Sequence, residues 1–130
     1  MTQPLFPLQE AREWLAIAAR DIRLAELALD DTPPMPGEAL YHAQQAAEKA
    51  LKGLLVANRA DYPLTHDVRK LLQLCVEIDN RLAALLPAAG LTQFAVRFRY
   101  PGEGHLTREE ALPWLDLARL VCAEVTRRLP

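Results

Sequence analysis

Arg99 and His105, with five residues between them, could together carry out chemistry on a phosphate ester. The intervening Pro101 and Gly102 favour a loop, which can hold an imidazole and a guanidinium together at the mouth of a helical bundle. The imidazole can then transfer a proton while the guanidinium stabilises the charge of a phosphodiester. The spacing also fits an ordinary loop in which Arg97 and Arg99 only complement the dipole of a preceding helix.

A second group of polar residues recurs at helical spacing. His42, Gln45, Lys49 and Lys52 follow one another at intervals of 3, 4 and 3, so they share one face of an expected helix. This polar stripe could line a groove that binds an anion. Alternatively it is a solvated helix face on which Lys52 pairs with Glu48 at i,i+4.

A third polar pair, His66 and Asp67, lies at the expected start of another helix. We interpret it as helix-start chemistry, in which Thr65 is the N-cap and the Asp67 carboxylate complements the helix dipole. The chain has no Gly-rich phosphate loop, no HExxH or GxSxG motif and no clustered carboxylate pair. Its 3 histidines lack the spacing of metal ligands. We therefore expect neither a metal nor another cofactor.

The composition indicates one folded domain over residues 1–130, because 51% of the residues are hydrophobic and 25% are charged. The net charge of −2 means that any anion-binding site must be local. Cys75 and Cys122 occupy apolar helix positions without metal or redox spacing, which fits a reducing compartment. Since neither a signal peptide nor a membrane span is recognisable, we expect a cytoplasmic protein that does not enter a membrane.

Hydrophobic periodicity predicts helices in the first half of the chain. Residues 1–7 contain two prolines and are expected to form an extended lead-in, and the proline-rich segment 30–37 ends the first helix. A second helix is expected over about residues 38–58. The apolar face of the first helix consists of Trp14, Ala18, Ile22, Ala25 and Leu29. That of the second consists of Leu40, Ala43, Ala47, Ala50, Leu51 and Leu54.

The second half of the chain predicts a third helix after Thr65, a broken fourth helix and a last helix. Pro87 and Gly90 are expected to interrupt the fourth helix. Thr107 and Glu110 form a capping box for the last helix, although Pro113 then lies too deep to be its first residue. Short loops between such helices predict an all-α, up-and-down antiparallel bundle of four to five helices.

Three segments together resemble one known family. Residues 41–55, with the sequence YHAQQAAEKALKGLL, resemble the second-helix signature of HEPN (higher eukaryotes and prokaryotes nucleotide-binding) domains. The segment Thr65-His66-Asp67-Val68 resembles the start of the family's third helix, and Arg99-Tyr100-Pro101 resembles its Arg-Tyr-Pro element. The resemblance covers about residues 14–129, and it is to small HEPN proteins that are often encoded beside a minimal nucleotidyltransferase.

This resemblance implies a helical bundle that commonly forms a homodimer. Many HEPN proteins are metal-independent RNases with an arginine and a histidine separated by four to six residues, and two such motifs meet across the dimer. Arg99 and His105 match that spacing. Catalytic members usually have Asn, Asp or His after the arginine, where this chain has Tyr100. The toxin subgroup has a tyrosine two residues past the histidine, where this chain has Thr107.

The resemblance thus implies an RNA-acting, toxin-type protein paired with a nucleotidyltransferase antitoxin, with Arg99 and His105 as catalytic residues. The alternative is a non-catalytic module that binds a nucleotide or a partner protein through the polar stripe, which Tyr100 and the acidic net charge favour. The expected substrate-binding residues are Tyr100, His42, Gln45, Lys49 and Lys52.

Overall fold

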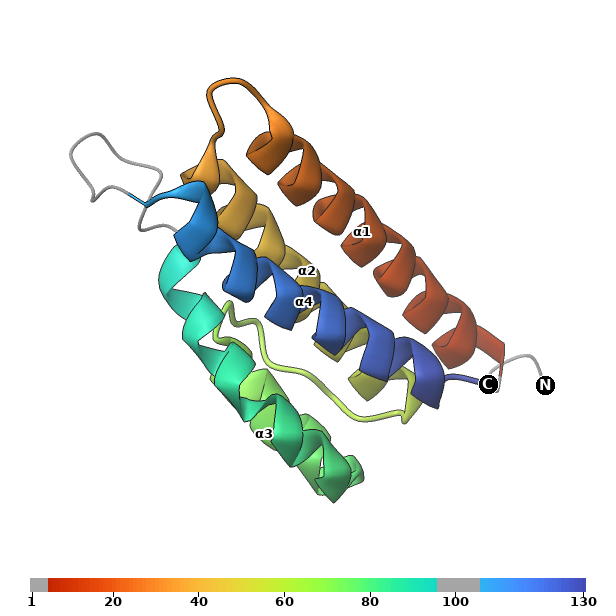
Figure 1. Ribbon diagram of the computed structural model, residues 1–130. Helices are drawn as coiled ribbons and strands as arrows, with labels where there is room; N and C mark the ends of the chain where they lie inside the picture. The colour runs from red at the N-terminus through yellow and green to blue at the C-terminus, as the bar shows by residue number, and fades with distance from the viewer. Residues whose placement is uncertain (1–4, 96–105) are drawn as a thin grey trace.

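The computed structural model describes residues 5–95 and 106–130, and in these ranges helices are the only regular secondary structure (Figure 1). The helices run up and down along one another, which confirms the predicted all-α antiparallel bundle. Four are α-helices, and η1 is a 3₁₀ helix. In chain order they are α1 (Leu5–Asp30), α2 (Pro36–Ala57), α3 (Val68–Ile78), η1 (Asn80–Phe94) and α4 (Arg108–Arg128).

Helix α2 is the centre of the bundle, since it packs against α1, α3, η1 and α4. Its predicted apolar stripe is fully buried, and its alanines let the neighbouring helices approach closely. Helix α1 lies close to α2 at Gly53, where an added Cβ would lie 3.2 Å from both the Ala11 carbonyl oxygen and Trp14 Cβ. A side chain at position 53 would therefore push α1 away from α2.

Helix α1 begins earlier than the sequence suggested. It starts at Leu5, so the expected lead-in over residues 1–7 overlaps the first helical turn. Pro7 is compatible with this start because the first N–H groups of a helix have no intrahelical acceptor. The helix ends at Asp30, the first residue of the proline-rich segment, as predicted, and α2 begins inside that segment, at Pro36 instead of about residue 38.

The start of α3 differs from the sequence prediction by two residues. Asp67, rather than Thr65, is the N-cap, and its side chain accepts a hydrogen bond from the Arg69 backbone N–H at 3.0 Å. The Thr65 hydroxyl instead accepts from the Asp67 N–H at 3.1 Å. The physical reason is that a threonine hydroxyl can close a local turn two residues long, and here that turn precedes the helix.

The predicted break at Pro87 and Gly90 is absent, because η1 continues through both residues. Gly90 lies directly against α4, where an added Cβ would be 2.5 Å from Trp114 Cη2. Helix α4 has the predicted capping box between Thr107 and Glu110. Pro113 lies inside α4 on its exposed side, so water can satisfy the backbone carbonyl that loses its intrahelical donor.

Candidate functional site

Arg99, Tyr100 and His105 lie in the segment 96–105, outside the residues that the structure describes. The two elements that flank this segment are well defined. The Phe94 ring at the end of η1 packs edge-on against Trp114 of α4, with the ring centroids 5.3 Å apart. The capping box fixes the start of α4 at Thr107. The segment therefore connects two helix ends that the fold holds together.

The polar stripe on α2 contacts two buried carboxylates. The first of them belongs to Asp21 of α1. Asp21 is only 6% exposed. Its Oδ1 lies 2.9 Å from His42 Nδ1, and its Oδ2 accepts a hydrogen bond from Lys49 Nζ at 2.7 Å. Asp21, His42 and Lys49 form what we call the Asp21 cluster, which connects α1 to α2.

The second carboxylate of the stripe is Glu48, which is 3% exposed. It accepts hydrogen bonds from Lys52 Nζ at 2.9 Å and from Gln44 Nε2 at 3.1 Å, and His66 Nδ1 lies 2.9 Å away. Burial opposes ionisation of Glu48, but these hydrogen bonds outweigh it and hold the pKa of the carboxyl below its ordinary value. Gln45 donates to Gln44 Oε1 at 2.7 Å. We call this group the Glu48 cluster, and its members are Gln44, Gln45, Glu48, Lys52 and His66.

Lys52 is the most enclosed cation of the stripe. It is 7% exposed, and its ammonium lies 5.8 Å from the Trp14 ring centroid and 5.7 Å from the Tyr62 ring centroid. The two rings meet edge to face at 5.9 Å. The predicted pair with Glu48 is present, but Lys52 is neither on a solvated face nor free to face a groove. Cation–π contacts and the buried ion pair make it part of the packing between α1 and α2.

His66 has a role that the sequence did not indicate. Its side chain is 74% exposed, yet its Nδ1 is held by the buried Glu48 carboxylate. Its backbone carbonyl also accepts a hydrogen bond from Gln44 Nε2 at 3.1 Å. These contacts fasten the loop before α3 to the middle of α2. Only the fold brings these groups together, because they are far apart in sequence and no local pattern signals their contact.

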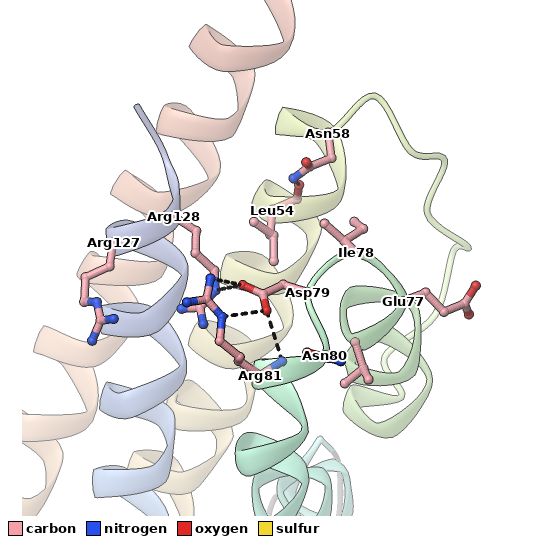
Figure 2. Close-up of a pocket in the computed structure, with 10 residues that line it drawn as sticks. Leu54, Asn58, Glu77, Ile78, Asp79, Asn80, Arg81, Arg127 and Arg128 are labelled. Carbon is pink, nitrogen blue, oxygen red and sulfur yellow. Dashed lines mark hydrogen bonds and ion pairs between the residues drawn. The ribbon is translucent and has the colours of Figure 1, made fainter.

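A pocket of about 760 Å³ lies beside the junction of α3 and η1, near the end of α4 (Figure 2). Asp79 is its main anion and accepts from Arg81 Nη2 and Arg128 Nε, each at 2.9 Å. Hydrogen bonds from Arg81, then from Arg128, hold the pKa of Asp79 well below its ordinary range. Arg128 also binds Glu124 Oε1 at 2.9 Å, and Arg127 binds Glu124 Oε2 at 3.1 Å. Arg128 of α4 thus connects that helix with the start of η1 through Asp79, whereas Arg127 binds only within α4.

A smaller pocket of about 310 Å³ lies between the end of α1 and the start of α4. Three arginines line it, and we call it the Arg23 pocket. Arg119 is firmly bound, at 2.8 Å from Glu26 Oε2, and this hydrogen bond raises the pKa of the guanidinium. Arg23 and Arg108 are held loosely, at 3.9 Å from Glu26 and 3.6 Å from Asp30. The other lining residues are Leu29, Leu112 and Leu115.

Comparison with known proteins matches residues 11–129 to the model of the HEPN domain. The chain belongs to the HEPN domain family. A solved structure, the crystal structure of TT1696 from Thermus thermophilus, is similar to this HEPN chain with a TM-score of 0.79 and 35% sequence identity. The similarity covers 92% of this chain and 98% of that chain. A search of curated proteins gave no match.

The described part of this HEPN domain contains no group of three or more His, Cys, Asp or Glu side chains that could hold a metal ion. Within the same ranges, no helix is long and apolar enough to cross a membrane. Burial raises the pKa of both Cys75 and Cys122 to about 12, so neither thiol is an activated nucleophile.

Proposed function

We propose that this HEPN protein is a metal-independent endoribonuclease in which Arg99 and His105 act on the RNA backbone. The observation that carries the proposal is the spacing of these two residues, with five between them, in a chain that matches the HEPN model over residues 11–129. The elements that flank Arg99 and His105 in the chain also support the proposal. Phe94 at the end of η1 packs on Trp114, and Thr107 caps α4, so both residues lie between two helix ends that are fixed in the bundle.

In the proposed reaction a ribose 2′-hydroxyl attacks the adjacent phosphorus. His105 accepts the hydroxyl proton as the new O2′–P bond forms. The P–O5′ bond breaks, and the His105 of a second copy donates a proton to the leaving 5′-oxygen. Arg99 stabilises the charge on the non-bridging oxygens. The products are a 2′,3′-cyclic phosphate and a 5′-hydroxyl, and DNA is not cleaved because it lacks the nucleophile.

The proposed biological setting is a cytoplasmic toxin–antitoxin pair in which a nucleotidyltransferase is the antitoxin. A homodimer belongs to this proposal because two copies of His105 are needed for the two proton transfers. Light scattering tests that requirement. A mass close to 14.6 kDa at micromolar concentration, instead of twice that value, contradicts the two-copy mechanism.

The second candidate is a non-catalytic module that binds a nucleotide or the partner protein. Tyr100 favours it, because a bulky phenol follows the arginine in the place of a small polar or imidazole side chain. Binding through the polar stripe receives less support, since Lys49 and Lys52 are bound to Asp21 and Glu48. A ligand there would have to compete with buried carboxylates for both cations.

The test is cleavage of single-stranded RNA by the purified chain in EDTA. We expect His105→Ala to lower the rate by about 10²–10⁴-fold, as for loss of a general acid–base residue. Arg99→Ala should abolish cleavage, and Arg99→Lys should restore little of it, because an ammonium cannot replace the planar guanidinium. Arg69→Ala, which removes an exposed arginine of α3, is the matched control. Equal cleavage by wild type and His105→Ala, or cleavage by neither, contradicts the proposal and favours the binding module.

A further inference from the structure

We propose that Arg23 of α1 and Arg108 of α4 bind phosphate groups of the substrate RNA beside the reacting bond. This inference rests on the proposed function. The Arg23 pocket lies where the end of α1 meets the start of α4, and the Arg108–Asp30 pair crosses between the two helices there.

The two arginines are available because their carboxylate contacts are weak. Separations of 3.6 and 3.9 Å are too long for hydrogen bonds, and both arginine side chains are exposed, at 42% for Arg108 and 67% for Arg23. Exposed ion pairs of this kind contribute little to stability. A phosphate can therefore replace Glu26 or Asp30 as the partner, and a guanidinium can bind it with two parallel hydrogen bonds.

The arginine side chains that line the pocket can bind a backbone phosphate. Its lining carries three arginines against the two carboxylates of Glu26 and Asp30, in a chain whose net charge is −2. Arg119, fixed between Glu26 and Asp116 at 2.8 Å from each, keeps Glu26 occupied on the α4 side. Arg23 and Arg108 approach Glu26 and Asp30 only at 3.9 and 3.6 Å, so these two guanidiniums can turn to a phosphate, and the apolar lining residues offer a surface for the sugar.

The pocket is also close to the proposed chemistry along the chain. Arg108 follows His105 by three positions, and three residues span at most about 11 Å when fully extended. A phosphate bound at Arg108 therefore belongs to a nucleotide near the one whose bond is cleaved. Arg81 and Arg128 of the pocket beside Asp79 are less suited to bind a phosphate, because both are hydrogen-bonded to Asp79 at 2.9 Å.

The experiment measures binding of a labelled, mixed-sequence single-stranded RNA to the full chain carrying His105→Ala, at several salt concentrations. Adding Arg23→Gln and Arg108→Gln removes two phosphate contacts. The slope of log affinity against log salt should then fall by about 1.4, and binding at 0.15 M salt should weaken roughly tenfold. The matched control adds Arg69→Gln and Arg127→Gln, which removes the same charge from exposed arginines elsewhere. The control should keep the slope of the parent.

In the catalytically intact chain, Arg23→Gln with Arg108→Gln should raise KM for RNA and leave kcat nearly unchanged, because the contacts exist before and during the reaction. Equal loss of affinity in the pair and the control, or no loss in either, overturns this inference even when the wild type cleaves RNA. If the wild type does not cleave RNA and the His105→Ala parent does not bind it, the proposed function itself fails. Circular dichroism spectra that match the parent confirm that the variants are folded.

Discussion

The lysines of α2 and the arginines of the Arg23 pocket are both cations beside carboxylates, but they are held in different ways. Lys49 and Lys52 lie 2.7 and 2.9 Å from carboxylates that are themselves at most 8% exposed. Arg23 and Arg108 lie 3.9 and 3.6 Å from carboxylates with at least 31% exposure. The first pairs are dry and short, whereas the second are solvated and long.

The difference shows why a polar pattern on a helix does not by itself identify a binding surface. A buried carboxylate that loses its cation is left uncompensated, so its partner cannot easily change. An exposed carboxylate is compensated by water when its arginine moves to another anion. Lys49 and Lys52 of the stripe therefore contribute to the packing of the bundle, whereas the carboxylate contacts of Arg23 and Arg108 are easier to exchange.

The largest expected effect on stability concerns the buried ion pair between Lys52 and Glu48. Lys52→Met leaves Glu48 without its main cation and should lower the free energy of unfolding by about 3–5 kcal/mol. Urea denaturation measures the change. Lys70→Met, which removes an exposed lysine of α3, is the control and should change stability by about 0.5 kcal/mol or less. A loss at Lys52 no larger than at Lys70 would show that the Glu48 cluster does not stabilise the fold.

A smaller loss is expected at the Asp21 cluster, whose cation Lys49 is half-buried. Asp21→Asn keeps the shape but removes the charge that holds His42 and Lys49, and it should cost about 1–3 kcal/mol. The same denaturation experiment measures it, with the exposed Asp31→Asn as control. If the two variants unfold at the same urea concentration, the contacts of Asp21 with α2 do not contribute to the free energy of unfolding.

The pH dependence of stability should change when Glu48 is replaced. Because the pKa of Glu48 is lower in the folded chain than its ordinary value of 4.5, its stabilising contribution is complete above that value. The contribution is lost as the pH falls through the folded-state pKa. Glu48→Gln should therefore be less stable than the wild type near neutral pH, and the gap should narrow in acid. Parallel stability curves of the two proteins, like those expected for the exposed Glu13→Gln control, would contradict this assignment.

The smallest stability effect is expected at the Arg23 pocket. Arg23→Gln and Arg108→Gln should each change the free energy of unfolding by about 0.5 kcal/mol or less, because exposed ion pairs contribute little. Thermal or urea unfolding of the single variants measures it. A loss comparable to that of Asp21→Asn would mean that these arginines are structural, and the comparison between the two regions would no longer hold.

Much of the fold could be predicted because it follows from local patterns. The apolar stripe of α2 is buried as its spacing predicts, and the Thr107–Glu110 capping box starts α4. The predicted start of α3 was wrong because two local signals compete there. Thr65 and Asp67 are both good caps, and a hydrogen bond from the Val68 N–H to the Thr92 hydroxyl at 2.9 Å accompanies the choice of Asp67.

The candidate site was predicted only in part, since Arg99, Tyr100 and His105 lie outside the described residues and their roles remain predictions. The polar stripe was correctly placed on one helix, but its partners were not foreseen except for Glu48. Arg23 and Arg108 gave no joint signal in the sequence, because one belongs to the polar face of the first helix and the other follows the cap of the last.

The sequence by itself indicated most of the helices, the cap of α4 and a possible pair between Glu48 and Lys52, since the geometry of a single helix sets contacts between residues up to four positions apart. Only the tertiary structure decided which charges are compensated by residues of another helix or loop. Asp21 reaches α2 from α1, His66 reaches it from the loop before α3, and Asp30 approaches Arg108 across two helices. Such contacts depend on the distance and burial that packing imposes, and neither quantity is encoded in local spacing.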